Sequence, residues 1–446
     1  MGRQIAVQIV FYNQRQAETE KLLKCLEGLK TPLGFEIVLR TGDCGDRTEI
    51  DVETWRNRLH AKGIAWTHAK FGENLGFGQG QNRLFATAPA DLIWMVNPDA
   101  LFTSTTLRDL CAFASRRPGW GMVEPRLSPI EHPKCVDART CETAWCSGCA
   151  PLVDARLYER VNGFDEAFFL YSEDVDLSWR IKAAGGGLYC CPSASVFHYR
   201  DEALSGPRNL WIHVSELLLL AKYGRKGFLT CRLADWLSAE PPLRDEIFST
   251  FAEASTRLKG ANPAERAAAS WSGRLNAPLR WQPQAVEAFA GPETPAVVVD
   301  GQDASPGEVA ECALSLWACG IPEISIDLEP EPASRLGGLL PFELEPEPHP
   351  EAVRIKATVR AFSSCVDPQR SWISRTVPSD QGWLASSIEA GIPAPSVLER
   401  LEDGGSIVCY RDAENWRSSI RLLRAKARLI RAPASAKSLL RTFALP

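Results

Sequence analysis

The run IAVQIVFY at Ile5–Tyr12 decides the fold of the first half of the chain. It is mostly apolar and rich in residues that favour strands, which is typical of a strand buried inside a parallel sheet. Four leucines at helical spacing follow it, at Leu22, Leu23, Leu26 and Leu29. Further strand candidates lie at Phe35–Leu39, Ile64–His68 and Asp91–Val96, each after a segment compatible with a helix. This alternation predicts a largely parallel sheet with helices on both faces.

The second half of the chain differs in composition and in its pattern of predicted elements. Ala252–Ala288 is rich in alanine and is expected to be helical, whereas Glu329–Pro350, which contains EPEP twice, reads as a linker. Strand candidates are Ala296–Asp300, Ile324–Leu328, Ile355–Phe362 and Ile407–Tyr410, and helix candidates are Pro306–Cys319, Gln381–Ala390 and Ala413–Leu429. We therefore predict an α/β domain over residues 1–228, a helical connecting region over 229–295 and a second α/β domain over 296–446.

Composition and charge exclude several classes of protein. The 446 residues include 50 Lys plus Arg and 55 Asp plus Glu, a formal net charge of −5 with no long basic run, so we expect no nucleic-acid partner. The longest apolar candidate, Trp211–Ala221, is too short to span a bilayer. The N-terminus reads as a first strand and not as a signal peptide. We expect a cytoplasmic protein without a transmembrane segment, either free or peripheral at the inner membrane face.

Two polar motifs follow predicted strands, where parallel sheets bind their ligands. ENLGFGQGQN at Glu73–Asn82 combines three glycines with Asn74 and Asn82 ahead of a helix, whose N-terminus can receive an anion. A plain glycine-rich turn is the alternative. Asn97-Pro98-Asp99 directly follows a buried strand and places a carboxylate where a divalent cation can bind. Here the alternative is an ordinary Asn-Pro-Asp turn.

A third motif is acidic and follows the aromatic run Phe168–Tyr171. Its three acids are Glu173, Asp174 and Asp176. Ser172 can cap a helix whose first turn carries them, where the helix dipole favours negative charge. Asp176 and Arg180 can form a plain i,i+4 pair, but such a pair does not account for the other two acids. His198, after a further strand candidate, becomes notable only beside a neighbour such as a metal.

Taken together and in this order, the motifs resemble a bacterial family 2 glycosyltransferase of the rhamnosyltransferase-like subgroup, over about residues 4–228. The matching positions are Tyr12-Asn13, Asn74 to Asn82, Asn97 to Asp99, Ser147-Gly148, Gly163 to Phe169, Glu173 to Arg180 and His198. Arg208-Asn209-Leu210 and Lys222-Tyr223-Gly224 also resemble the family's closing helix. The resemblance implies a GT-A fold, followed here by a second α/β domain. It also implies an inverting, single-displacement transfer of a sugar from a nucleotide-diphosphate donor to a glycan or lipid-linked acceptor in polysaccharide synthesis.

The resemblance also implies roles for individual residues. Asp174 matches the base that deprotonates the acceptor hydroxyl, with Glu173 as second choice. Asp99 and His198 would hold a divalent metal, Mg²⁺ or Mn²⁺, that neutralises the leaving diphosphate. Donor-binding positions would be Tyr12, Asn13, Asp43, Asn74, Gly76, Phe77, Gly80, Asn82 and Asn97, supported by Asp165, Asp176 and Arg180. The donor nucleotide is left open among UDP, dTDP and GDP.

The sequence departs from the family pattern after the second strand. The family has an aspartate-asparagine-x-serine loop there, where this chain has Arg40–Asp46, so either Asp43 or Asp46 is expected to contact the base. The departure keeps an inactive sugar-binding or scaffold protein as the alternative function. A nucleotidyltransferase is a weaker one, because only Arg15 offers a phosphate-gripping charge in the first loop. The C-terminal half faintly resembles a GT-B nucleotide-binding half, and an accessory domain is the alternative.

The chain also contains 14 cysteines, which secretion, metal binding or apolar packing would each explain. In a cytoplasmic protein they are expected to be reduced. Cys135, Cys141, Cys146 and Cys149 have a spacing that a zinc site can use. Because Cys146 and Cys149 flank the Ser147-Gly148 pair of the family's acceptor-side strand, we favour packing.

Overall fold

The structure is a computed structural model of the whole chain. It describes residues 2–128, 132, 136–137, 140–198, 207–237, 241–269, 280–282, 285–288, 296–302, 304–318, 321, 323–328, 336, 338–346, 352–357, 360–362, 373–377, 396–400 and 406–409. The expected helices Gln381–Ala390 and Ala413–Leu429 lie outside these residues. None of the described helices is both long and apolar enough to cross a membrane.

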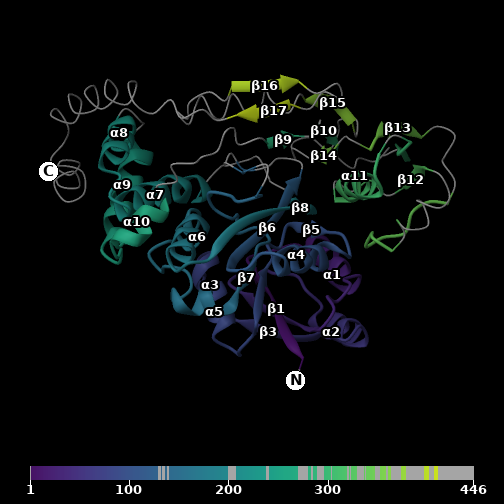
Figure 1. The fold of residues 1–446 in the computed structure, drawn as a ribbon, viewed down its shortest axis with the longest axis horizontal. Coiled ribbons are helices and arrows are strands. Elements are labelled where there is room, and N and C mark those ends of the chain that lie inside the picture. The colour runs from purple at the N-terminus through teal and green to yellow at the C-terminus, as the bar shows by residue number, and fades with distance from the viewer. Residues whose placement is uncertain are drawn as a thin grey trace.

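An eight-stranded mixed sheet forms the centre of the N-terminal half (Figure 1). Its strands are β1 (Arg3–Phe11), β2 (Phe35–Asp43), β3 (Ala65–Lys70), β4 (Leu92–Met95), β5 (Ala100–Phe102), β6 (Trp120–Ser128), β7 (Leu152–Asp154) and β8 (Gly187–His198). They are ordered β3-β2-β1-β4-β7-β6-β8-β5. β3, β2, β1 and β4 are parallel, β7 is antiparallel to β4, and β5 is antiparallel to β8. The expected parallel sheet is therefore the first half of a larger mixed one.

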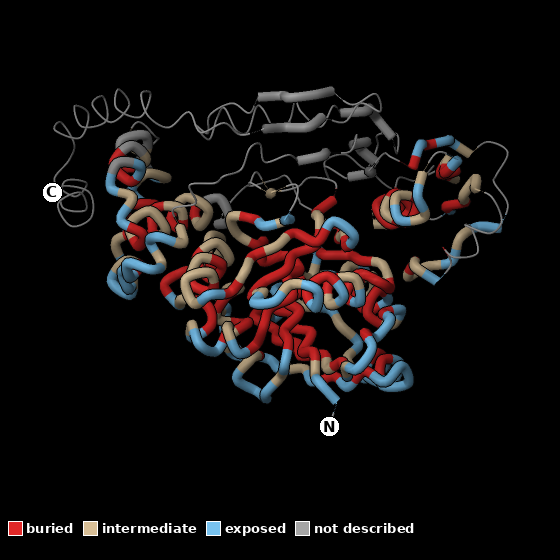
Figure 2. The backbone as a smooth tube through the Cα atoms, viewed as in Figure 1, coloured by how far each residue is buried: buried red, intermediate tan, exposed pale blue. Residues whose placement is uncertain are grey.

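Helices cover both faces of this sheet, as the sequence predicts. One face packs against α1 (Gln16–Glu27), α2 (Val52–Ala61) and α4 (Thr106–Ser115), and the other against α3 (Gly76–Phe85), α5 (Ala155–Arg160) and α6 (Glu173–Ala183). In β4, Trp94 belongs to the first core and Ile93 and Met95 to the second, because successive strand residues point to opposite faces. Buried residues accordingly follow the strands of the sheet (Figure 2).

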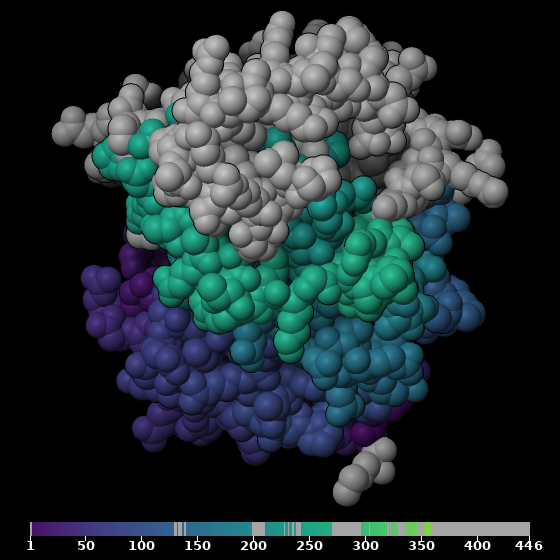
Figure 3. All heavy atoms as spheres, turned by 90° about the vertical axis from the view of Figure 1, so that its left-hand side faces the viewer, coloured from purple at the N-terminus to yellow at the C-terminus, as the bar shows by residue number. Residues whose placement is uncertain are grey.

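Four helices follow the sheet. They are α7 (Pro207–Lys222), α8 (Lys226–Trp236), α9 (Pro241–Ser255) and α10 (Pro263–Ala269). Buried side chains of α7, α8 and α9 form a core of their own with Phe168, which comes from the loop ahead of α6. Figure 3, seen from this side, shows them in teal and green against the blue residues of the sheet domain. The expected helical segment does not continue to residue 288, because β9 (Arg280–Gln282) and β10 (Ala285–Ala288) are strands. Pro283 between them disfavours a helix interior.

The C-terminal half contributes a small parallel sheet of order β12-β11-β13. Its elements are β11 (Val297–Asp300), α11 (Pro306–Ala318), β12 (Ile324–Asp327) and β13 (Val353–Lys356), close to the expected strand–helix–strand pattern. Two further three-stranded sheets have the orders β14-β10-β15 and β16-β17-β9. Their C-terminal strands are β14 (Arg360–Phe362), β15 (Ile373–Val377), β16 (Ser396–Arg400) and β17 (Ser406–Cys409).

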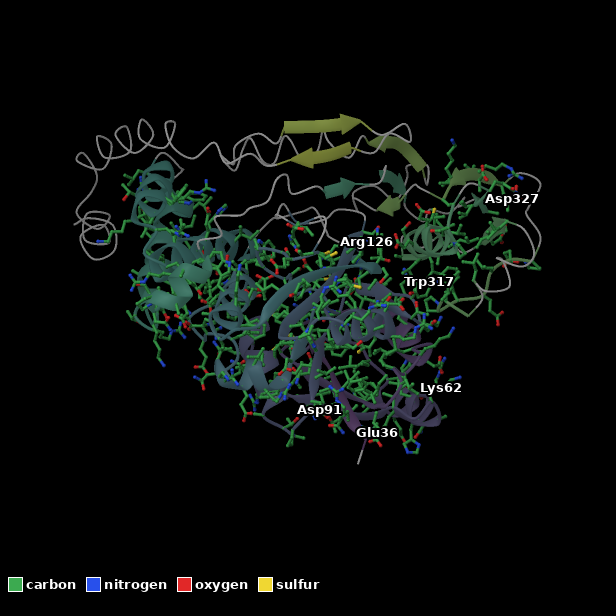
Figure 4. The ribbon with its side chains drawn as sticks, viewed as in Figure 1. Glu36, Lys62, Asp91, Arg126, Trp317 and Asp327 are labelled. Carbon is green, nitrogen blue, oxygen red and sulfur yellow. The ribbon has the colours of Figure 1, made fainter. Side chains whose placement is uncertain are left out.

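The α11 unit packs directly against the large sheet domain. Arg126 on β6 forms an ion pair with Glu311 on α11 at 2.7 Å, and the Lys21 ammonium donates to the Ala318 carbonyl at 2.8 Å. Figure 4 labels Arg126 and Trp317 on the two sides of this contact. The Ser104 hydroxyl donates to the Gly338 carbonyl at 2.6 Å. Buried residues of α11 and β11 consequently share one hydrophobic core with α1 and β1.

Candidate active site

The carboxyl ends of β1 and β2 carry the first candidate residues. Asp43 closes β2 and is buried, and its Oδ1 accepts bonds from the Gly45 N–H at 2.9 Å and the Thr48 hydroxyl at 2.8 Å. Asn13, at φ 57°, has an Oδ1 that accepts from the Arg47 N–H at 3.0 Å. Together these bonds hold the two strand-end loops against each other.

This geometry separates the two aspartates that the sequence left open. Asp43 is 3% exposed and anchored at the strand end, whereas the side chain of Asp46 is 89% exposed and lies 3.6 Å from Arg47. Tyr12, 48% exposed beside them, leaves its ring open to a ligand. The arrangement favours Asp43 over Asp46 as the contact of a bound base.

Gly76 begins α3 with a positive φ of 71°, a conformation that favours glycine. A Cβ at this position would lie 2.0 Å from the Phe169 carbonyl oxygen, which accepts from the Phe77 N–H at 3.2 Å. The Asn74 Oδ1 accepts from the Gly76 N–H at 3.1 Å. The start of α3 is therefore seated on the loop that precedes the acidic motif.

The other glycines of ENLGFGQGQN lie inside α3, not in a loop. A Cβ on Gly78 would meet Phe164 at 2.9 Å and one on Gly80 would meet Val10 at 2.9 Å, so both permit close packing. Asn82 also faces protein. Its Oδ1 accepts from the Phe164 N–H at 2.8 Å and from the Tyr158 hydroxyl, and its Nδ2 donates to the Phe164 carbonyl at 2.9 Å.

Asp174 lies in the first turn of α6 and meets two other segments. Its Oδ2 accepts from the Gly148 N–H at 2.8 Å and its Oδ1 from the Val175 N–H at 2.8 Å. A Cβ on Gly148 would lie 3.1 Å from the Phe77 ring and 3.4 Å from the Asp174 Cβ. Gly148 thus lies next to both Phe77 and Asp174, although those two residues are 97 positions apart in the chain.

Glu173 has a different environment from its neighbour. It is 5% exposed, and its Oε2 has no hydrogen-bond partner among the described residues. Burial, reinforced by the charge of Asp174, raises the pKa of Glu173 well above its ordinary value. Glu173 is therefore a buried carboxyl whose charged form is disfavoured, while Asp174 is the more accessible of the two.

Behind Asp174 lies a buried network of charges centred on Asp176. This carboxylate is fully buried and accepts from Arg180 Nε at 2.7 Å, from Lys222 Nζ at 2.6 Å and from the Tyr223 hydroxyl at 2.9 Å. Lys222 also pairs with Asp165 at 2.6 Å. The predicted i,i+4 pair of Asp176 and Arg180 exists, but it is one part of a larger cluster.

The Asn-Pro-Asp turn connects β4 to β5 and brings Asp99 beside His198. The pairing of β5 with β8 sets Ala100 opposite His198, which places Asp99 Oδ1 3.3 Å from His198 Nε2. Burial alone would lower the pKa of His198, but Cys149 and Asp99 outweigh it and raise the pKa to about 10. The Asn97 N–H donates to the Cys149 carbonyl at 2.8 Å, and Asn97 Oδ1 is buried without a hydrogen-bond partner in the part of the chain that the structure describes.

The Asp99–His198 pair fits a divalent metal in part. A carboxylate and an imidazole are two protein ligands, and the buried Asn97 oxygen without a hydrogen-bond partner is a further polar atom nearby. Among the described residues no group of three or more His, Cys, Asp or Glu side chains is arranged to hold a metal. The described cysteines are free thiols, most of them buried, whereas Cys135 lies outside the described residues. Any metal held here would complete its shell with ligands from the donor.

Three further residues support the site: Lys222, Tyr223 and Cys149. Lys222 and Tyr223 belong to the family resemblance, but their contact with Asp176 was not predicted, because 46 positions separate Lys222 from Asp176. Cys149 lies against His198. Its position next to Ser147-Gly148 was the only available signal.

The eight-stranded sheet and the helices on its two faces confirm the expected α/β fold class. No family model matches the sequence. Curated relatives do match part of it. Rhamnosyltransferase WbbL of Escherichia coli is 44% identical over 55 residues, which are 12% of this chain and 21% of the relative. An N-acetylglucosaminyl-diphospho-decaprenol L-rhamnosyltransferase of Mycobacterium tuberculosis is 39% identical over 77 residues, 17% of this chain and 22% of the relative.

The chain thus spans about a fifth of the length of the curated relatives it matches. Over these segments, the expected resemblance to rhamnosyltransferase-like glycosyltransferases of family 2 is confirmed.

Solved structures of glycosyltransferases are also similar. TarS 1-349 of S. aureus in complex with UDP-GlcNAc has a TM-score of 0.42 at 13% identity, covering 57% of this chain and 82% of that one. The mannosyltransferase PcManGT of Pyrobaculum calidifontis, in complex with GDP-Man and Mn²⁺, has a TM-score of 0.36 at 16% identity, covering 60% of this chain and 78% of that one.

Proposed function

We propose that the chain is an inverting glycosyltransferase that moves a sugar from a nucleotide-diphosphate donor to a glycan or lipid-linked acceptor. The observation that carries the proposal is the segment Gly148-Cys149. The Gly148 N–H binds the carboxylate of Asp174, and the Cys149 carbonyl binds the N–H of Asn97, next to Asp99 and His198. A candidate base and a candidate phosphate-side cluster thus flank one short segment.

Such an arrangement suits direct displacement at a sugar carbon. The acceptor hydroxyl oxygen attacks the anomeric carbon, the bond to the diphosphate breaks on the opposite face, and Asp174 takes the hydroxyl proton. Two backbone N–H groups hold the Asp174 carboxylate in place. We assign Glu173 no proton transfer, because it is buried and its Oε2 has no hydrogen-bond partner among the described residues.

The leaving diphosphate is neutralised at the other side of the site. A divalent ion, Mg²⁺ or Mn²⁺, would supply charge stabilisation there. Asp99 and His198 would hold it, and Asn97 Oδ1 is a nearby polar atom that no described residue hydrogen-bonds. The base of the donor would lie between Tyr12 and Asp43, with Asn13 holding the loop.

The names of the relatives support the choice of substrates. Both are rhamnosyltransferases, so a deoxyhexose donor is our first choice, ahead of a hexose. The decaprenol relative supports a lipid-linked acceptor. Such an acceptor would place the protein at the cytoplasmic face of the membrane, where polysaccharide precursors are assembled. We propose residues 1–228 as the transferase domain and the C-terminal part as an accessory region.

Donor identity is tested by thermal shift with UDP-, dTDP- and GDP-sugars, including nucleotide-activated rhamnose. A ligand at 100 times its Kd stabilises the native state by about 2.7 kcal/mol. Turnover is then measured for the wild type, Asp174→Asn and the exposed control Asp46→Asn. We expect Asp174→Asn to lose at least a hundredfold in kcat and Asp46→Asn to lose less than threefold.

Three outcomes would contradict parts of this proposal. Equal turnover by Asp174→Asn and the wild type removes Asp174 as the base. Donor binding without turnover by the wild type, across a panel of glycan and lipid-linked acceptors, favours the sugar-binding or scaffold alternative. Full activity after EDTA treatment, with Asp99→Ala also active, would remove the metal from the proposal.

A further inference from the structure

Helix α7 contacts the base-bearing helix through charges that water does not reach. Lys222 is 5% exposed and Asp176 is fully buried, and their charged atoms are 2.6 Å apart. Lys222 binds Asp165 at the same distance, and Arg180 binds Asp176 at 2.7 Å. Two cations and two anions therefore balance within one cluster. Because a buried charge without its partner is costly, the cluster ties its segments together.

The segments that it ties are the ones that present Asp174. Asp176 lies two residues beyond Asp174 in the first turn of α6, and Asp165 lies in the loop ahead of that helix. Closer to Asp174, the Ser215 hydroxyl of α7 donates to the Leu170 carbonyl at 2.7 Å. Contacts from α7 thus reach the chain both before and after the candidate base.

The start of α6 needs such support. Its N-cap residue Ser172 has φ 60° and makes no side-chain capping bond, and the preceding Tyr171 has φ 68°. Left-handed conformations are unfavourable for residues other than glycine, and they persist only where surrounding contacts impose them. Capping, the usual means of fixing a helix start, is therefore missing at the turn that carries Asp174.

We propose that Lys222 and Tyr223 are positioning residues that hold the first turn of α6, and with it Asp174, at the edge of the sheet. The inference rests on the proposed function for its kinetic consequences. It makes the end of α7 a working part of the transferase, although sequence analysis placed the domain boundary only a few residues further on. Neither residue touches the substrate in this role.

Tyr223→Phe is the main test, because it removes one hydroxyl and no charge. We expect a three- to tenfold lower kcat with an unchanged donor KM. Lys222→Met should lower kcat more than tenfold and Lys222→Arg should restore part of it. The matched control is Lys226→Met, at an exposed site at the start of α8, with kcat within twofold of the wild type. Equal kcat for Tyr223→Phe and the wild type would overturn the proposal.

A double-mutant comparison separates positioning from general loss of structure. If Tyr223 acts through Asp174, Tyr223→Phe should not lower the residual rate of an Asp174→Asn variant any further. If Tyr223→Phe lowers the rate of the Asp174→Asn variant by the same factor as it lowers the rate of the wild type, the two residues act independently and the proposal is contradicted.

A hydrogen-exchange measurement keeps the inference testable apart from the function. Amides at residues 173–176 should exchange at least threefold faster in Tyr223→Phe than in the wild type, and equally fast in Lys226→Met. This readout needs no donor or acceptor. Unchanged exchange in Tyr223→Phe refutes the positioning role even if the wild type proves to be a transferase. If the wild type shows no turnover but exchange is faster in Tyr223→Phe, the positioning role is supported and only the proposed function is contradicted.

Discussion

Substituting Asn82 by alanine tests whether this residue binds the donor or holds the fold. In the structure, all the hydrogen bonds of its side chain go to protein, two to the peptide groups of Phe164 and one to Tyr158. The substitution would leave the Phe164 N–H and carbonyl and the Tyr158 hydroxyl without a partner, and both residues are at most 3% exposed. At about 1 kcal/mol for each lost bond, the free energy of unfolding should fall by about 3 kcal/mol.

The change is measured by urea unfolding followed by tryptophan fluorescence, together with the donor affinity of the folded protein. A loss of this size lowers the Tm of a domain of this length by roughly 6–12 °C. Asn74→Ala is the matched control. The Asn74 side chain accepts an exposed hydrogen bond from the Gly76 N–H, so its removal should lower the free energy of unfolding by less than about 1 kcal/mol. An Asn82→Ala protein of normal stability that no longer binds donor would refute the reasoning and make Asn82 a ligand contact.

Three further predictions concern backbone strain and pH. Gly76→Ala should lower the free energy of unfolding by well over 1 kcal/mol and reduce turnover, because the added Cβ meets the Phe169 carbonyl. The control Gly72→Ala has φ 78° but open space around it, so the free energy of unfolding measured in urea should fall by only about 1 kcal/mol. Glu173→Gln should stabilise the protein at pH 8 but not near pH 4. Burial and Asp174 raise the pKa of Glu173 in the folded protein. The contribution of this carboxyl to stability is therefore complete below its unfolded pKa of about 4.5 and declines as pH rises. Equal urea midpoints of variant and wild type at pH 8 would contradict this. Burial, with the charge of Arg232, lowers the pKa of His213. The α7–α10 helices should therefore lose stability as pH falls below about 6.5. A melting temperature that does not change between pH 7.5 and pH 5 would contradict this prediction.

The sequence predicted the layered part of the fold well. Apolar strands such as IAVQIVFY are decided by local composition, and their carboxyl ends must meet at one edge of a parallel sheet. Asn13, Asp43 and Asn97 could therefore be placed together in advance. The pairing of β5 with β8, which brings His198 to Asp99, could not be predicted from local patterns, and the family resemblance alone suggested it.

Other features depend on contacts that no local pattern encodes. Three glycines after a strand suggested a loop, but Gly78 and Gly80 lie in α3. Glycine fits at these two positions because the ring of Phe164 and the side chain of Val10 occupy the space that a Cβ would need. Asp43 and Asp46 are equivalent in sequence, and only burial distinguishes them. Lys222 belongs to the family resemblance, but its ion pairs could not be predicted because its partners lie 46 and 57 residues away.

The contact between Ser104 and Gly338 has a consequence for how the protein is made. Those two residues are 234 positions apart, so a ribosome that adds about 5–20 residues per second needs roughly 12–47 s to supply the second after the first. During that interval the surface around α1 and β5 that α11 later covers faces the cell without its cover. Nascent chains therefore expose an apolar surface, to which chaperones are expected to bind, until residues 297–345 have been synthesised and α11 covers that surface.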